Sequence, residues 1–130
     1  MKNKALMHLL LPIFEEYEDF LAAYLFGSRA DSDPSPDSDV DIGVLFNDRV
    51  SLEWLVRIQN AIEEALGHRT DVVDLRAASS YLALDIVRGR RFLCTDEFRC
   101  DEFELFVLAR AGDLAPFERQ RRAALLGVEA

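Results

Sequence analysis

The stretch FGSRADSDPSPDSDVDIGVL, residues 26–45, constrains the fold of this chain more than any other. One apolar run, FLAAYLF, ends just before Gly27, and a second, VDIGVLF, begins beside two aspartates, Asp39 and Asp41. Side chains two positions apart on a strand point to the same face of the sheet. The two carboxylates should therefore lie close together at the mouth of an apolar strand. Unpaired, their repulsion would raise the pKa of one of them.

A divalent cation between these carboxylates would remove the repulsion, and hard carboxylate oxygens suit Mg²⁺. Such a site needs a third acid from a neighbouring strand, and the stretch TDVVDL at 70–75 offers Asp71 and Asp74. These two are three residues apart, so they face opposite sides of a strand and only one of them can join the pair. We favour Asp71, near the start of its strand, with Asp74 as the alternative.

The turn after the first apolar run has the composition of a phosphate-binding turn. Gly27 lets the backbone turn sharply and approach a ligand closely. If a helix starts at Ser28, its free N–H groups favour a phosphate, and the Ser28 hydroxyl adds a donor. Arg29 follows directly and could also reach a phosphate. A phosphate-binding turn beside three carboxylates and one or two Mg²⁺ ions describes a site for nucleotidyl transfer.

The hydrophobic pattern along the chain predicts a mixed α/β domain with a small sheet flanked by helices. Apolar residues at helical spacing predict four helices, at 6–17, 52 to about 66, 77–87 and 97 to about 124. In the third of these helices we expect Tyr81 to face inward. Short apolar runs predict four strands, the first two paired as a hairpin, at 20–26, 40–46, 70–75 and 90–95. We expect one domain over residues 1–130, with a C-terminal helical arm from about 97 to 126.

The charge balance narrows the classes of partner. The chain carries 24 acidic and 15 basic residues, a formal net charge of −9. This acidity argues against direct binding to a nucleic-acid backbone, and it permits bound divalent metals or a basic protein partner. No apolar run approaches the roughly 18 residues of a membrane span, and no signal-peptide cleavage site is visible, so we expect a cytoplasmic protein without membrane contact.

The spacing Gly27-Ser28, ten residues, Asp39-Val-Asp41 resembles the signature of the DNA polymerase beta-like nucleotidyltransferase superfamily. More closely, the chain resembles the minimal nucleotidyltransferase (MNT) proteins. The stretches YLFGSRA, SDVDIGVLF and TDVVDL occur in the family's order with the expected gaps. The tail DEFELFVLARAGDLAPFERQRRAAL also resembles the helical tail of MNT antitoxins, although that part is less specific.

The resemblance implies both a site and an activity. Carried over from the family, Asp39, Asp41 and Asp71 bind Mg²⁺, and Gly27 and Ser28 hold the triphosphate of ATP. Family members of this size are commonly encoded beside a small all-helical HEPN ribonuclease, for which they act as antitoxins. Some transfer AMP from ATP to a tyrosine of that toxin. We therefore expect this chain to be a protein adenylyltransferase that assembles with a HEPN toxin.

Two other functions remain open from the residues. The first is a non-catalytic antitoxin that neutralises its partner by binding, suggested by the net charge of −9 and an apolar arm around Phe103, Phe106 and Phe117. The second is modification of a small molecule, as antibiotic nucleotidyltransferases perform. Those enzymes carry an additional substrate domain, for which this chain has little room.

Overall fold

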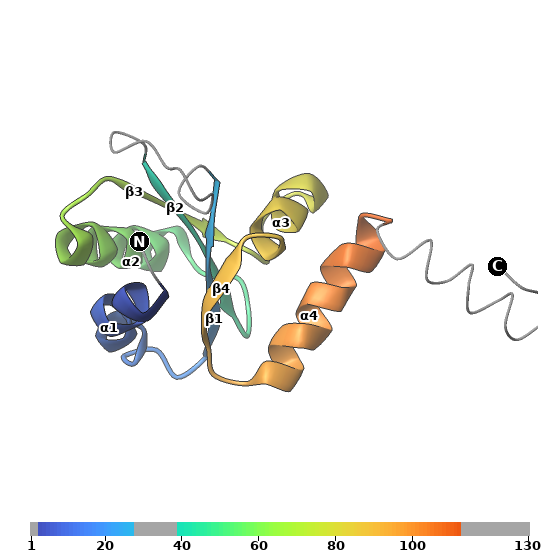
Figure 1. Ribbon diagram of the computed structural model, residues 1–130, viewed down its shortest axis with the longest axis horizontal. Coiled ribbons are helices and arrows are strands. Elements are labelled where there is room, and N and C mark those ends of the chain that lie inside the picture. Colours follow the sequence, from blue (N-terminus) through green and yellow to red (C-terminus); the bar gives the residue numbers. More distant parts are fainter. Residues whose placement is uncertain (1–2, 28–38, 113–130) are drawn as a thin grey trace, which may run out of the picture.

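The computed structural model describes residues 3–27 and 39–112, which form one sheet with helices on both faces (Figure 1). The elements follow in the order α1 (Asn3–Phe14), β1 (Phe20–Phe26), β2 (Val40–Phe46), α2 (Leu52–Leu66), β3 (Thr70–Asp74), α3 (Ser80–Val87), β4 (Arg90–Cys94) and α4 (Glu97–Arg110). The strands form a mixed sheet in the order β3-β2-β1-β4. The predicted α/β architecture is confirmed.

The pairing of the strands brings the ends of three strands together at one edge of the fold. Strands β1 and β2 pair antiparallel, as the predicted hairpin requires, and Phe26 lies opposite Asp41. Strands β2 and β3 run parallel, so they start at the same end of the sheet, and Asp41 lies beside Asp71. Strand β4 pairs antiparallel with the other side of β1. The end of β1 and the starts of β2 and β3 therefore meet.

Two apolar clusters hold the layers together, one on each face of the sheet. Helices α1 and α2 cover one face, and α3 and α4 cover the other (Figure 1). Alternate residues of β1 enter the two clusters: Ala23 and Leu25 pack toward α1 and α2, and Tyr24 and Phe26 pack toward α3 and α4. Every residue of β1 is consequently buried, which explains why its sequence is a continuous apolar run.

Helix α2 has the boundaries that its sequence predicts. The Ser51 hydroxyl accepts a hydrogen bond from the Trp54 N–H and so caps the first turn. Gly67 ends the helix in the left-handed conformation, at φ +64°. The inner face is formed by Ile58 and Ile62, which are fully buried.

The structure corrects three predicted details of the helices. Helix α1 ends at Phe14 rather than at residue 17, and α3 begins at Ser80 rather than at 77, because the Ser79 side chain caps it. The prediction that Tyr81 faces inward is wrong, since its side chain is 87% exposed. Ala83 and Ile86 form the inner face, and a residue two positions before Ala83 lies on the opposite side of a helix.

The C-terminal arm is described as far as Arg110, the last residue of α4, and the turn that follows it. Its predicted continuation to about 126 lies outside the described residues. No helix in the described ranges combines the length and the apolar character that crossing a membrane requires.

Candidate active site

The candidate site is built around two adjacent carboxylates, Asp41 on β2 and Asp71 on β3. They are register partners in a parallel pair of strands, so both side chains leave the same face of the sheet. Asp71 is exposed and Asp41 is half-buried. Burial raises the pKa of Asp41, and the negative charges of Asp71, Asp39 and Asp85 raise it further. The fold thus brings together acids that repel one another.

Asp39 lies one residue before β2, on the same side of the strand as Asp41. Its Oδ1 is 3.9 Å from the Nε of Arg69, whose side chain is 85% exposed, while that of Asp39 is 43% exposed. An exposed ion pair of this length contributes little to stability, so it holds Asp39 only weakly. Within the described part of the chain, no three His, Cys, Asp or Glu side chains stand close enough to hold a metal ion as they lie.

The turn at the end of β1 touches the candidate site directly. Gly27 has a φ of +74°, a conformation that residues with a side chain rarely adopt. A Cβ atom at this position would collide with Oδ2 of Asp41. Glycine is therefore required twice, for the turn and for the close approach of the Asp41 carboxylate to the backbone. Ser28 and Arg29, the other predicted phosphate ligands, lie outside the described residues.

Asp74, the alternative third acid, is buried and has a structural role. It is 4% exposed and lies beside Val44, which packs into the core toward α1 and α2. Its carboxylate accepts hydrogen bonds from the backbone N–H groups of Val50, at 2.8 Å, and Arg76, at 3.1 Å. Asp74 thereby stabilises the turns after β2 and β3. Because Asp74 lies on the other face of the sheet and its oxygens already accept hydrogen bonds, the structure favours Asp71 as the third acid.

A fourth carboxylate, Asp85 on α3, acts on the site and was not predicted from the sequence. Helix α3 packs unusually close to β2, because a Cβ on Gly43 would lie only 2.5 Å from Cγ2 of Ile86. The next side chain, Asp85, is exposed, and its charge contributes to the raised pKa of Asp41. The one signal in the sequence is Gly43, since a glycine inside a strand often marks the close approach of another element.

Comparisons with known proteins agree with this geometry. Residues 9–98, more than half of the chain, match the family model described as polymerase beta, nucleotidyltransferase. The chain therefore belongs to the polymerase beta nucleotidyltransferase family. It is also 30% identical to the protein adenylyltransferase MntA of Shewanella oneidensis over 101 residues, which cover 77% of this chain and 70% of that relative.

Solved structures share the whole architecture. A chain in a toxin–antitoxin complex with AMP-PNP superposes with a TM-score of 0.72 at 22% identity, covering 97% of this chain and 99% of that chain. A chain in the complex of a tri-AMPylated Shewanella oneidensis HEPN toxin with an MNT antitoxin gives a TM-score of 0.65 at 22% identity, covering 95% and 96%. These structures show that the chain has the fold of their matched chains.

Proposed function

We propose that this chain is an Mg²⁺-dependent adenylyltransferase that moves AMP from ATP to a hydroxyl group, most simply a tyrosine, of a HEPN ribonuclease toxin. In doing so it acts as the antitoxin of that toxin. The observation that carries the proposal is the pair Asp41 and Asp71, held in register beside the tight turn at Gly27. The relative MntA is named a protein adenylyltransferase, and similar folds occur in complexes of toxins with antitoxins.

The residues present fit a divalent cation. Two adjacent carboxylates with a third beside them offer hard oxygen ligands, and the repulsion that raises the pKa of Asp41 is the kind that a cation relieves. Asp39, Asp41 and Asp71 would hold Mg²⁺. When bound, the ion neutralises charge on the triphosphate and activates the acceptor hydroxyl.

The chain's own residues would then position the nucleotide. The backbone at Gly27 is open to a close ligand because it has no side chain, and it lies against the carboxylate of Asp41. Ser28 and Arg29 follow in sequence and would supply a hydroxyl donor and a positive charge to the phosphates. Because the reaction consumes ATP, we place the protein in the cytoplasm.

Transfer of label from ATP tests the proposal. Purified chain, Mg²⁺ and a purified HEPN toxin are incubated with ATP radiolabelled at the α-phosphate. We expect label on the partner with the native chain, and a loss of at least about 100-fold with Asp41→Asn or Asp39→Asn, since each removes a charged ligand. Asp48→Asn is the matched control, because Asp48 is exposed in the turn after β2. Label transfer that survives both substitutions would refute the assigned site.

The same variants separate catalysis from neutralisation by binding alone. The acidic net charge and the exposed apolar residues of α4 are compatible with an antitoxin that simply covers its partner. If the variant with Asn at both positions 39 and 41 loses label transfer but still protects cells from the toxin, neutralisation rests on binding. Loss of protection with an intact complex supports the enzyme.

A further inference from the structure

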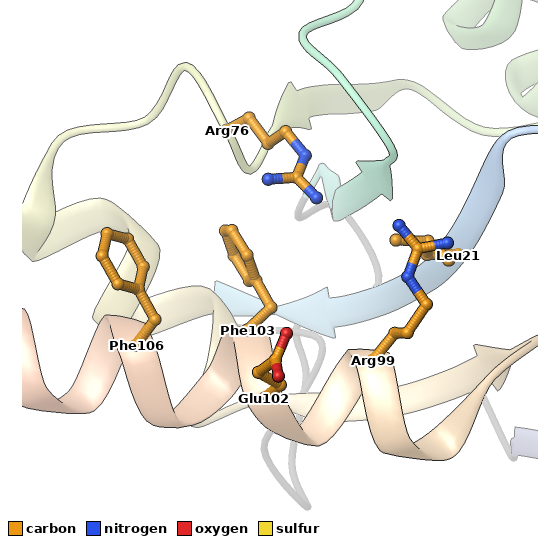
Figure 2. Close-up of a pocket in the computed structure, with 6 residues that line it drawn as sticks. All are labelled: Leu21, Arg76, Arg99, Glu102, Phe103 and Phe106. Atoms are coloured by element: carbon orange, nitrogen blue, oxygen red, sulfur yellow. The ribbon is translucent and has the colours of Figure 1, made fainter.

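A pocket of about 350 Å³ lies on the face of the sheet that α4 covers (Figure 2). It is lined by Leu21, Arg76, Arg99, Glu102, Phe103 and Phe106. Leu21 lies at the start of β1, five residues before Phe26, which pairs with Asp41. At the usual rise of a strand this separation is about 17 Å. The pocket is therefore distinct from the nucleotidyl-transfer site.

Two guanidinium groups face this pocket without a carboxylate partner. Arg76 is fixed in place: its Nε donates to the Phe46 carbonyl at 2.6 Å, and its guanidinium carbon is 4.9 Å from the centre of the Phe103 ring. Figure 2 shows its guanidinium group above the Phe103 ring, with one terminal nitrogen directed toward the side on which Arg99 lies. Across residues 3–27 and 39–112, no acidic side chain lies within 4.0 Å of either guanidinium.

This local positive charge is unusual in a chain of net charge −9. Arginines in such a chain have many carboxylates available, and Arg91 for example pairs with both Asp101 and Glu104. Two guanidiniums that converge on one pocket offer the planar donor geometry that carboxylates bind best. Glu102 also lines the pocket, so two guanidiniums stand against one carboxylate, and the remaining positive charge is complementary to one acidic group.

The apolar surface continues outside the pocket along α4. Phe98, Leu105 and Phe106 are 75%, 54% and 52% exposed, and their spacing places them along one side of the helix. Glu102 lies between them and also lines the pocket. Exposed apolar side chains grouped beside a charged pocket are typical of a surface that binds another protein.

We propose that this surface docks a partner polypeptide that presents an acidic side chain flanked by apolar ones. The carboxylate binds between Arg76 and Arg99, and the flanking side chains pack on Phe98 and Phe106. The docking site is independent of nucleotidyl transfer, because it lies at the other end of the sheet. It would hold a partner while leaving the acids of the candidate active site open.

A peptide titration tests the docking site. The full-length chain, labelled with ¹⁵N, is titrated without ATP or Mg²⁺ with a capped peptide of sequence Ser-Leu-Phe-Glu-Leu-Ser, and with the same peptide carrying Gln in place of Glu. We expect saturable amide shifts at Arg99, Phe103 and Phe106. The Gln peptide should bind roughly 10-fold more weakly, since it lacks the charge-assisted hydrogen bonds.

The matched variants are Arg99→Glu and Arg57→Glu, which make the same change of charge on opposite faces of the sheet. Arg99 is exposed and its side chain makes no ion pair in the described residues, so Arg99→Glu should fold normally, as a retained amide spectrum will show. We expect Arg99→Glu to weaken peptide binding by about 10-fold or more. Arg57→Glu, on α2, should leave it unchanged.

Several results would overturn the docking site. Equal binding of the Glu and Gln peptides would contradict the role of the guanidiniums. Binding of 3-phenylpropionate as tight as that of the peptide would show a small-molecule pocket instead. Peptide binding that appears only in a Phe117→Ser variant would show that the chain's own C-terminal segment occupies the surface. The Asp41→Asn variant should lose AMP transfer but bind the peptide like the native chain. Peptide binding and AMP transfer can therefore fail independently, and a failure of one proposal is distinguished from a failure of the other.

Discussion

At the scale of single residues, the candidate site is a compromise between stability and chemistry. Asp41 is pressed against the backbone of Gly27 on one side and lies beside Asp71 on the other. Its raised pKa shows that the folded state disfavours its charge. A fold under selection for stability alone would avoid this arrangement, so the carboxylates make sense only with a ligand that they share.

Removing the charge of Asp41 should stabilise the metal-free protein. Repulsion between neighbouring strand residues is worth up to about 1 kcal/mol, so we expect Asp41→Asn to raise Tm by a few degrees at neutral pH. A carboxyl with a raised folded pKa destabilises the fold above that pKa, and the penalty fades as pH falls through it. The gain should therefore shrink on acidification from pH 7 to 4, measured by thermal denaturation with EDTA. A gain that is constant with pH would contradict the repulsion.

Gly27→Ala should abolish AMP transfer, and the strain that the substitution puts on the backbone should not be the cause. A left-handed residue with a side chain costs about 1–2 kcal/mol, and here the added Cβ also displaces the Asp41 carboxylate. Gly67→Ala is the matched control, because Gly67 has a φ of +64° and nothing within 4 Å of an added Cβ. Both variants should lose similar stability in urea denaturation, and only Gly27→Ala should lose AMP transfer. Equal transfer by the two would show that the contact with Asp41 is unimportant.

At the scale of elements, the close packing of α3 on β2 brings Asp85 toward the strand acids. The contact depends on Gly43, which shares the face of Asp41 and lies directly beneath Ile86. Gly89, after α3, is similarly tight, because a Cβ there would collide with the Leu25 carbonyl oxygen. Two glycines therefore set the distance between the helix and the sheet.

A double-mutant cycle measures this contact. Gly43→Ala should destabilise the protein by about 1–3 kcal/mol through overpacking, and Ile86→Ala by about 2–5 kcal/mol through a cavity. In the double variant the new methyl group fills part of the cavity, so its loss should be smaller than the sum of the two. The free energies come from urea denaturation. Strictly additive losses would show that Gly43 and Ile86 do not share the same space.

The elements themselves were largely predictable, and the parts that were not have physical reasons. The predicted strands 20–26 and 40–46 and the predicted helix from 52 to about 66 agree with the structure, because Gly27, Ser51 and Gly67 mark where these elements begin or end. The start of α3 was missed because Ala77 and Ala78 suit a helix, and only the cap at Ser79 and the turn held by Asp74 exclude them. The error at Tyr81 has a separate cause: the prediction places Tyr81 on the inner face beside Leu82, whereas that face is centred on Ala83 and Ile86.

At the scale of the whole molecule, the sheet carries different chemistry at its two ends. The acids lie where β2 and β3 begin, and the adjacency of Asp41 and Asp71 matches the expected third acid on a neighbouring strand. The pocket lies at the opposite end, and its residues come from β1, the turn after β3 and α4. No local pattern links Leu21, Arg76 and Arg99, so only the tertiary structure brings them together.

The central claim is that Asp39, Asp41 and Asp71 hold a divalent cation beside the triphosphate, and Mn²⁺ binding measured by electron paramagnetic resonance in the presence of AMP-PNP tests it most directly. The native chain should show saturable binding of Mn²⁺, and Asp41→Asn and Asp71→Asn should each weaken it by about 10-fold or more, on the scale of losing one charged ligand. Asp74→Asn, once shown to be folded, should bind Mn²⁺ like the native chain. Unchanged binding in Asp71→Asn, or its loss in folded Asp74→Asn alone, would contradict the account.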